Sequence, residues 1–581
     1  MTAADPPRTP SEDEIGLDPE DKCLKQPCVH EIDSSVLSEP RGRVARLKGR
    51  FPQYRVAVLV LVGCFFSGWW LSIIIQKEHR SKWLVPTALY VLIMVRLLTW
   101  RNRVLNRGFG MVQRAWNCGC DCVYERVLPK RAHRLLVGAG GTLVMVLLAT
   151  FVSQDTPFSK RSDRAVSFVG LLVVLVCLYA TSRNRTKIVW NAVIGGVLLQ
   201  FMVALFVLRT KAGFDFFNFV SLLARSLLSF AKDGVAFLTS VQVSQTPMFF
   251  FLVLPSVAFF VAFVNILYYW GVVQWFVRKF ASFFFWALRI SGAEAITASA
   301  SPFIGIGESA ILIADLLPFL TIGELHQVMT SGFSTISGAV LVGYIGLGLS
   351  PQALVSSCVM SIPASIVVSK MRCPETEESI CKRTVKFAED VDCGKSKLRN
   401  ALEAFSSGAS LGLFTAATML VQCLCIIALV SLVNGILTWF GSFWNINGLS
   451  LNMIFQYIFY PGTFLLGVPR NEVFHVSQLL AAKFIQNEYV AYSMLMHDAP
   501  YNEMSPRGTL IATYALCGFA NLGSVGITLG VLNALSKGKR AGDIAKNVTS
   551  ALFSGFVATM MTAAVSGMLI QDLLMFANAN Y

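Results

Sequence analysis

Charged side chains are scarce in this chain of 581 residues, where Asp, Glu, Lys and Arg together make up 14%. Ordinary soluble domains carry about a quarter charged residues, so the composition argues against a water-soluble protein. Histidines are also few, six in all, and none has the spacing of a zinc ligand set. Hydrophobic residues instead make up 54%. The composition therefore predicts a membrane protein, and we expect neither a bound metal nor another cofactor.

Apolar runs recur to the end of the chain. A helix needs roughly 20 apolar residues to cross about 30 Å of hydrocarbon. Continuous runs of this kind are 55–75, 83–99, 135–152, 166–182, 188–208, 248–270, 410–433 and 549–573. Apolar runs interrupted by Gly, Pro, Ser, Asn or Glu are 296–320, 325–348, 352–369, 448–470, 474–495 and 508–535. We predict an all-α polytopic membrane protein.

The basic residues predict the orientation. Segments rich in Lys and Arg precede the first span and follow the second and the fourth, all on one side if the N-terminus is cytoplasmic. The net charge of +15 is mostly accounted for in this way, and no soluble domain carries a basic patch, so no nucleic-acid partner is expected. Residues 1–50 are polar, rich in Ser and Pro at first, and are predicted to form a disordered cytoplasmic tail.

Three of the 14 cysteines cluster at Cys118, Cys120 and Cys122, in a basic loop that we place in the cytoplasm. Palmitoylation next to the membrane, or a weak metal site, is one interpretation of such a cluster. Unmodified reduced thiols are the simpler one, and it is favoured here.

Polar residues inside apolar runs are the candidates for function, because an ionised carboxylate in lipid costs roughly 2.5–3.5 kcal/mol. They are Glu308, then Lys483, Asn487 and Glu488, and then Asn521 and Ser524. Residues three or four apart share one face of a helix, so Lys483 and Asn487 are expected to face one cavity, as are Asn521 and Ser524. A buried ion pair between Lys483 and Glu488, or between Lys483 and Glu308, remains an alternative.

Pro302, Gly305 and Gly307 crowd the sequence before Glu308. Non-helical backbone is tolerated at membrane depth only where it lines a cavity or is buried in protein. The stretch from Pro302 to Glu308 is therefore predicted to be the tip of a re-entrant hairpin or an unwound helix. An interrupted segment with a polar tip occurs near 290–348 and again near 448–535, as in transporters built from repeats with discontinuous helices.

The stretch AAKFIQNEYVAY resembles the signature of the concentrative nucleoside transporters, with Tyr489 in place of a Phe. The segments GELHQVMTSGFSTISGAVLVGYI, SIPASIVVSKMRCPETEES and IATYALCGFANLGSVGI are also similar to that family. The resemblance runs from about residue 188 to the C-terminus. It implies an inverted-repeat transporter of the plasma membrane, with two re-entrant hairpins and discontinuous helices, that forms a homotrimer.

The resemblance also divides the chain. Residues 51–185 fit the extra N-terminal transmembrane helices of the longer eukaryotic members, and residues 186–581 fit the transport core. Within the core, we expect an interfacial helix at about 212–232, hairpin 1 at about 288–320 and hairpin 2 at about 445–470.

The family's binding residues map onto this chain by position. The resemblance implies base contacts at Ile306, Gly307 and Glu308, ribose contacts at Glu488, Asn521 and Ser524, and packing against the nucleoside at Val340 and Phe519. Such roles suit the chemistry, since a carboxylate accepts from sugar hydroxyls, an amide both donates and accepts, and apolar side chains sandwich a ring. Lys483 and Asn487 are expected to support these residues.

Ile306 and Gly307 stand where the family usually has Gln-Thr to read the base. Ile306 lacks the amide that would pair with a pyrimidine, and Gly307 leaves room for a base of two rings. An apolar residue at the first position also resembles the purine-preferring members. We expect a purine-preferring importer, with a sodium-coupled transporter of broad specificity as the alternative.

Sodium in this family sits between the hairpin tip and the unwound part of the next helix, held partly by an Asn side chain. Here Ser301 takes that position, and Pro302 is expected to bias Ser301 toward an extended conformation. The carbonyls of Ile304 and Ile336 and the hydroxyl of Thr335 remain as possible ligands for sodium.

Binding of a proton needs no such set of oxygen ligands. Glu308 in a tip of low dielectric constant is the first candidate to carry one, and Glu488 is the second. Proton coupling is therefore favoured over sodium coupling. The same two acids leave an intramembrane enzyme open as a remote alternative, although no activated nucleophile is apparent, and a channel lined by the broken segments is another.

Overall fold

The computed structural model describes residues 52–75, part of 86–94, 131–156, 159–244, 248–305, 309–377 without 311 and 315, and 400–570 without 447. The chain divides into two compact units, Met1–Cys118 and Gly119–Tyr581. In the first unit, α2 (Pro52–Ile75) coincides with the first predicted span. The predicted tail and the cluster from Cys118 to Cys122 lie outside the described residues.

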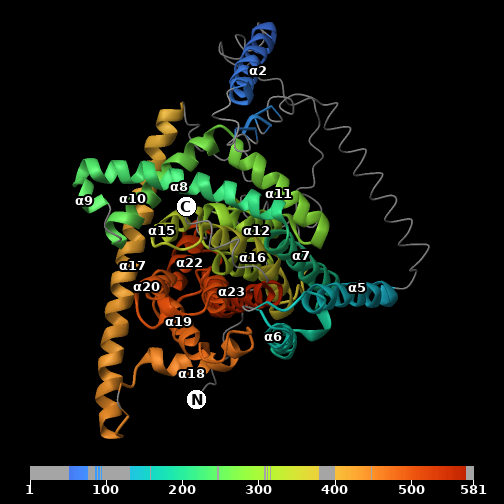
Figure 1. Ribbon diagram of the computed structural model, residues 1–581, viewed down its shortest axis with the longest axis vertical. Helices are drawn as coiled ribbons and strands as arrows, with labels where there is room; N and C mark the ends of the chain where they lie inside the picture. The colour runs from blue at the N-terminus through green and yellow to red at the C-terminus, as the bar shows by residue number, and fades with distance from the viewer. Residues whose placement is uncertain are drawn as a thin grey trace, which may run out of the picture. The chain divides into compact units, whose positions relative to one another are not determined.

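Helices make up the second unit (Figure 1). They are α5 (Arg131–Phe151), α6 (Arg161–Ala180), α7 (Trp190–Arg209), α8 (Lys211–Leu238), α9 (Val241–Ser244), α10 (Phe249–Tyr269), α11 (Val272–Leu288), α12 (Gly292–Ile304), α14 (Ile322–Ser334), α15 (Gly338–Gly346), α16 (Pro351–Arg372), α17 (Ala401–Phe443), α18 (Leu451–Phe464), α19 (Val473–Ile485), α20 (Glu488–His497), α21 (Pro506–Leu516), α22 (Leu522–Leu535) and α23 (Ala541–Leu569). Among the described residues, five helices, α6, α7, α16, α17 and α23, are long and apolar enough to cross a membrane. The prediction of an all-α polytopic membrane protein is confirmed.

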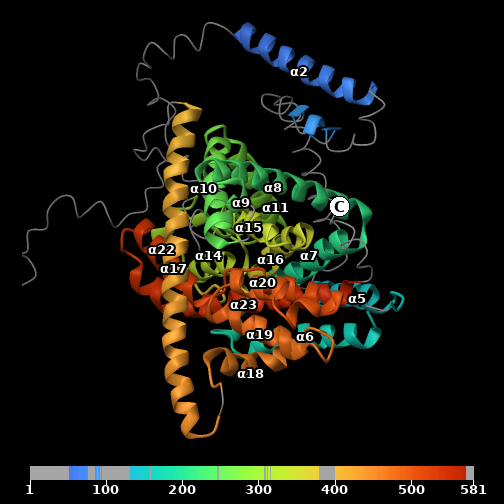
Figure 2. The ribbon, with the colours of Figure 1, turned by 60° about the vertical axis from the view of Figure 1, so that its left-hand side comes forward.

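A similar order of elements occurs twice in the second unit. The first copy runs through α10, α11, α12, the broken pair α14 and α15, and α16; the second runs through α17, α18, the pair α19 and α20, the broken pair α21 and α22, and α23. The opening helices α10 and α17 pack against each other, as do the closing helices α16 and α23. Figure 2 shows α17 running unbroken along one side of the unit. This is the predicted inverted-repeat architecture with discontinuous helices.

A sharp bend separates α10 from α11, whose axes differ by 81°. Gly271 makes this bend with a φ of 74°. Glycine adopts such a left-handed conformation without the steric cost that a Cβ atom brings. The bend turns α11 out of the direction of the span, and α11 then packs against α12.

The predicted first hairpin, about 288–320, contains α12, and its tip at residues 306–308 lies outside the described part of the chain. The structure differs from the prediction for the second hairpin. The range 445–470 holds α18 and the turn after it, whereas the break next to Glu488 separates α19 from α20. Pro461 and Gly467 interrupt the apolar run at 448–470, a sequence pattern that a hairpin tip would also show. The predicted interfacial segment, about 212–232, lies within α8.

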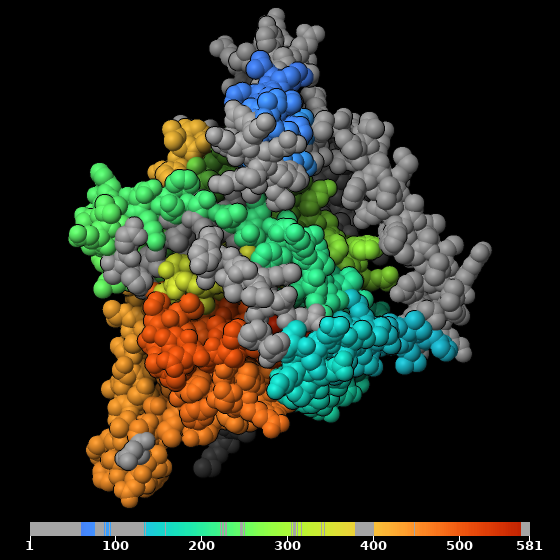
Figure 3. Space-filling view, viewed as in Figure 1, coloured from blue at the N-terminus to red at the C-terminus, as the bar shows by residue number. Residues whose placement is uncertain are grey.

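Arg507 ties several elements of the second unit together. Its guanidinium donates to the carbonyl oxygens of Gly467 and Gly567, each at 2.9 Å, and to Oγ of Ser159 at 3.2 Å. On the surface, the cyan region that holds α6 lies beside the orange region that holds α18 and α19 (Figure 3). A cavity of about 380 Å³ lies between them. The turn after α18 is thus anchored to α6, α21 and α23.

Candidate functional site

Glu488 is the first residue of α20, directly after the break at Gln486 and Asn487. Asn487 starts the new helix because its Oδ1 accepts from the backbone N–H of Val490 at 2.9 Å. The Glu488 side chain is buried, at 4% exposure. Its carboxylate lies at the positive end of the helix dipole, which stabilises a negative charge.

Two side chains from other helices donate to the Glu488 carboxylate. The hydroxyl of Tyr344, in α15, lies 2.7 Å from Oε1. The amide Nδ2 of Asn521, at the start of α22, lies 2.8 Å from Oε2. Each carboxylate oxygen thus has a side-chain donor. Because an ionised carboxylate offers about four lone-pair positions, it can also accept hydrogen bonds from a polar ligand.

Asn521 and Ser524 contact each other, as their spacing predicts. Asn521 is the N-cap of α22, and its Oδ1 accepts from the backbone N–H of Ser524 at 2.8 Å and from the Ser524 hydroxyl at 3.0 Å. The amide therefore bridges Ser524 and Glu488. The structure brings together the three residues predicted to contact ribose.

Tyr344 is absent from the predicted site. Its side chain is fully buried, and its ring packs against Tyr492 with the ring centroids 5.0 Å apart. The sequence did contain one indication that Tyr344 belongs to the site, because Tyr344 follows Val340 by four residues and so shares its helix face. A tyrosine in an apolar run is nonetheless ambiguous in a sequence, since its partner lies on a distant helix.

The two broken helices meet next to this carboxylate. The backbone N–H of Phe519, between α21 and α22, donates to the carbonyl oxygen of Thr335, between α14 and α15, at 3.3 Å. A Cβ atom on the neighbouring Gly518 would lie 3.0 Å from the carbonyl oxygen of Phe333, so a glycine permits this approach. Val340 is buried one turn into α15. The breaks of the two discontinuous helices, one in each of the interrupted segments of the sequence, are therefore in direct contact.

The Lys483 ammonium contacts α21 and α23, which differs from the alternative of an ion pair with Glu488. Its Nζ donates to the carbonyl oxygen of Ala515 at 2.8 Å and to the Thr559 hydroxyl at 3.0 Å. Among the described residues, Lys483 and Glu488 form no ion pair. The four-residue spacing does not place Lys483 and Asn487 on one helix face, because α19 ends at Ile485. Lys483 instead joins α19 to α21 and α23.

Ser301 also departs from the prediction. It lies inside α12, which continues through Pro302 to Ile304, so Pro302 does not impose an extended conformation on it. In the last turn of a helix the missing N–H of a proline costs a single hydrogen bond. The Ser301 hydroxyl donates to the carbonyl oxygen of Thr297 at 2.7 Å.

The other predicted ion-site residues are only partly brought together. The Thr335 hydroxyl donates to the carbonyl oxygen of Ser331 at 3.0 Å, and the side chain of Ile336 is buried beside it in the break before α15. Ile304 ends α12. Ile306, Gly307 and Glu308 lie outside the described residues, so the alternative pairing of Glu308 with Lys483 lies outside them too.

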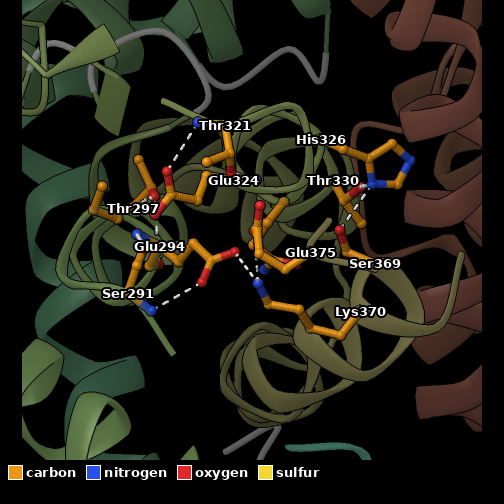
Figure 4. Close-up of polar contacts among 12 residues, drawn as sticks. Ser291, Glu294, Thr297, Thr321, Glu324, His326, Thr330, Ser369, Lys370 and Glu375 are labelled. Carbon is orange, nitrogen blue, oxygen red and sulfur yellow. Dashed lines mark hydrogen bonds and ion pairs between the residues drawn. The ribbon is translucent and has the colours of Figure 1, made fainter. Parts of the chain in front are cut away.

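A second group of buried polar side chains surrounds Lys370, near the end of α16 (Figure 4). The Lys370 ammonium lies 2.5 Å from Oε1 of Glu294 and 3.6 Å from Oε2 of Glu375. Glu294 and Glu324 complete the capping boxes that begin α12 and α14. Burial raises the pKa of Glu375, which follows the end of α16, although the Lys370 charge opposes this shift. This network joins α16 to the base of the first hairpin.

In the part of the chain that the structure describes, no group of three or more His, Cys, Asp or Glu side chains is arranged to hold a metal ion. A buried carboxylate lies instead where the broken helices of two repeats meet. Discontinuous helices at a repeat interface are the features of a secondary membrane transporter.

Comparisons with known proteins identify the family. Models described as the Na+ dependent nucleoside transporter N-terminus, nucleoside recognition (Gate), and the Na+ dependent nucleoside transporter C-terminus match residues 169–241, 250–351 and 353–567. Solute carrier family 28 member 3 of Homo sapiens is 38% identical over 476 residues, which cover 77% of this chain and 68% of that protein. The Mus musculus member 3 is 38% identical over 458 residues, 77% of this chain and 64% of that protein. The chain thus spans about two thirds of these relatives. It belongs to the concentrative nucleoside transporter family.

Solved structures share the fold. The structure of CNTnw in an inward-facing substrate-bound state is 28% identical to this chain, with a TM-score of 0.64, and the match covers 70% of this chain and 97% of that one. A CNTnw variant in an outward-facing state is 29% identical, with a TM-score of 0.65, and covers 71% and 98%.

Proposed function

We propose that this protein is an ion-coupled importer that concentrates nucleosides across the plasma membrane by alternating access. The observation that carries the proposal is the buried Glu488 carboxylate, which Tyr344 and Asn521 hold and which is a strong acceptor for sugar hydroxyls. The names of relatives such as sodium/nucleoside cotransporter 2 of Mus musculus, which is 32% identical over 469 residues, support a nucleoside substrate. The inward- and outward-facing structures of CNTnw support alternating access.

Uptake into cells that lack their own nucleoside transport tests this function. Cells that make the protein are expected to show saturable uptake of labelled nucleoside and to accumulate it above the external concentration. Collapse of the ion gradients is expected to abolish the accumulation. Uptake that only equilibrates would indicate a channel or a facilitator, and chemical conversion of the nucleoside by the purified protein would indicate an enzyme.

The proposed substrate contacts fall into three groups. Glu488, Asn521 and Ser524 bind the ribose, and Val340 and Phe519 pack against the nucleoside. Ile306, Gly307 and Glu308 contact the base. The grouping of the first three residues around one carboxylate supports the ribose assignment, because hydroxyl groups need both acceptors and donors.

A preference for purine nucleosides follows from Ile306 and Gly307, which offer no side-chain amide to a pyrimidine. Competition between adenosine and uridine for uptake of either labelled compound tests it. Adenosine is expected to compete better than uridine, and Ile306→Gln to reduce that difference. The preference is refuted if uridine competes better, or if Ile306→Gln leaves the ratio unchanged.

For the coupled ion we propose a proton, with Glu308 as its first carrier and Glu488 as the second. Ser301 replaces the family's Asn, and its short side chain is already engaged with the carbonyl oxygen of Thr297. Sodium is the second candidate, because the family models and several relatives are named for it. The backbone carbonyls of Ile304 and Ile336 and the hydroxyl of Thr335 are then its remaining ligands.

Uptake at acid and at neutral external pH, with sodium or an inert cation, separates the two ions. Acid is expected to stimulate uptake without sodium, and Ser301→Asn is expected to introduce sodium stimulation. Strict sodium dependence of the unmodified protein at both pH values would overturn proton coupling. It would leave nucleoside transport itself intact.

The family also suggests an assembly and an orientation. We propose a homotrimer in which each subunit has its own site, with a cytoplasmic N-terminus. Native mass spectrometry of the purified protein is expected to give three times the chain mass. An epitope placed at the N-terminus is expected to be reached by antibody only after the cells are permeabilised.

A further inference from the structure

The bond between Tyr344 and Glu488 joins the two repeats at the candidate site. Tyr344 comes from α15 of the first repeat, and Glu488 begins α20 of the second. The hydroxyl-to-carboxylate distance is 2.7 Å, and the two side chains are 0% and 4% exposed. A hydrogen bond to a charged group is among the stronger ones in proteins.

The phenol ring has little freedom to move. It packs against the rings of Tyr492 and Tyr489, with centroids 5.0 and 6.4 Å away. Its hydroxyl therefore approaches Oε1 from one direction, while Asn521 approaches Oε2. Two donors on opposite oxygens hold the plane of the carboxylate, which a single donor would leave free to rotate.

We propose that Tyr344 is a positioning residue that orients the Glu488 carboxylate toward the sugar of the substrate and so contributes to the selection of ribonucleosides. This inference rests on the proposed nucleoside transport. Tyr344 acts through Glu488, so a substrate that makes no hydrogen bond to Glu488 gains nothing from it. The role thus differs from packing, which would affect every substrate alike.

The chain offers a matched control in Tyr492. This tyrosine is also fully buried in the same aromatic cluster, but its hydroxyl donates to the carbonyl oxygen of Thr513 at 2.9 Å. Replacement of either tyrosine by phenylalanine keeps the ring and removes one hydroxyl. The two variants therefore differ in whether Glu488 loses a donor.

The experiment measures the KM for adenosine uptake, and the inhibition constant of 2′,3′-dideoxyadenosine, which lacks the 2′ and 3′ hydroxyls and keeps the 5′ hydroxyl. Tyr344→Phe is expected to raise the KM for adenosine about tenfold and to leave the inhibition constant of the dideoxynucleoside unchanged. Tyr492→Phe is expected to change neither. Because KM does not depend on how many molecules reach the surface, a lower yield of a variant does not obscure the result.

A double-mutant cycle with Glu488→Gln completes the test. On that background, Tyr344→Phe is expected to have less than a twofold further effect, since the oriented group is already altered. Equal losses for adenosine and dideoxyadenosine, or an unchanged adenosine KM in Tyr344→Phe, would overturn the positioning role. An unmodified protein that takes up no nucleoside would instead refute the proposed function.

Discussion

The amide nitrogen of Asn521 lies 2.8 Å from a carboxylate oxygen of Glu488, although 33 residues separate them in the chain. Each residue stands where a half-helix begins, Glu488 at the start of α20 and Asn521 as the cap of α22. The positive ends of two helix dipoles therefore lie beside one buried acid. A change at either residue is expected to affect the other.

Glu488→Gln is expected to weaken nucleoside affinity by roughly one to two orders of magnitude, because one acceptor oxygen becomes a donor and the charge is lost. The KM for uptake measures the effect. Glu503→Gln, at an exposed carboxylate, is the control and is expected to have no effect. A Glu488→Gln protein with normal surface level and unchanged KM would refute the assignment.

Asn521→Ala is expected to remove both the cap of α22 and the donor to Glu488. Loss of a cap alone costs about 0.5–2 kcal/mol. Asn400 caps α17 in the same way, through the backbone N–H of Glu403 at 2.8 Å. Both alanine variants are therefore expected to lower the unfolding temperature, while only Asn521→Ala raises the KM. Similar KM values in the two variants would contradict a role of Asn521 in binding.

Lys370→Met is expected to destabilise the protein strongly, since Glu294 loses its cationic partner. Removal of one member of a buried ion pair costs roughly 3–5 kcal/mol. The midpoint of thermal unfolding of the purified protein measures this, and addition of Glu294→Gln is expected to restore part of the loss. The control is Arg161→Met, because the Arg161–Asp155 pair spans 3.7 Å and is exposed. Equal effects of the two single substitutions would show that the Lys370 network contributes little.

The raised pKa of Glu375 predicts a pH dependence of stability. A carboxyl whose folded-state pKa lies above its unfolded value binds protons more tightly when folded. Its contribution to the free energy of unfolding is therefore largest at low pH and falls as the pH rises from the unfolded to the folded pKa. Unfolding midpoints from about pH 4 to about pH 8 are expected to show a smaller acid-side dependence in Glu375→Gln than in the unmodified protein. An identical dependence in both proteins would contradict this prediction.

Local patterns were sufficient for some parts of the site. The sequence predicts a functional role for Glu488, Asn521 and Ser524, because polar groups are costly inside apolar runs. The contact between Asn521 and Ser524 follows from a three-residue spacing at the start of one helix. The partners of Lys483 could not be predicted in this way. Its direction depends on the end of α19 at Ile485 and on the carbonyl oxygen of Ala515, which belongs to another helix.

The amino-acid sequence by itself determined the class of protein, because lipid accepts only long apolar segments with satisfied backbone groups. It also determined where helices begin, since Asn487 and Asn521 cap α20 and α22 with their own side chains. Only the tertiary structure decided that Tyr344 would donate to Glu488. That bond joins two repeats whose relative placement depends on the packing of α14 against α23 and of α16 against α21 and α23. Such long-range packing leaves no periodic signal in a local stretch of sequence.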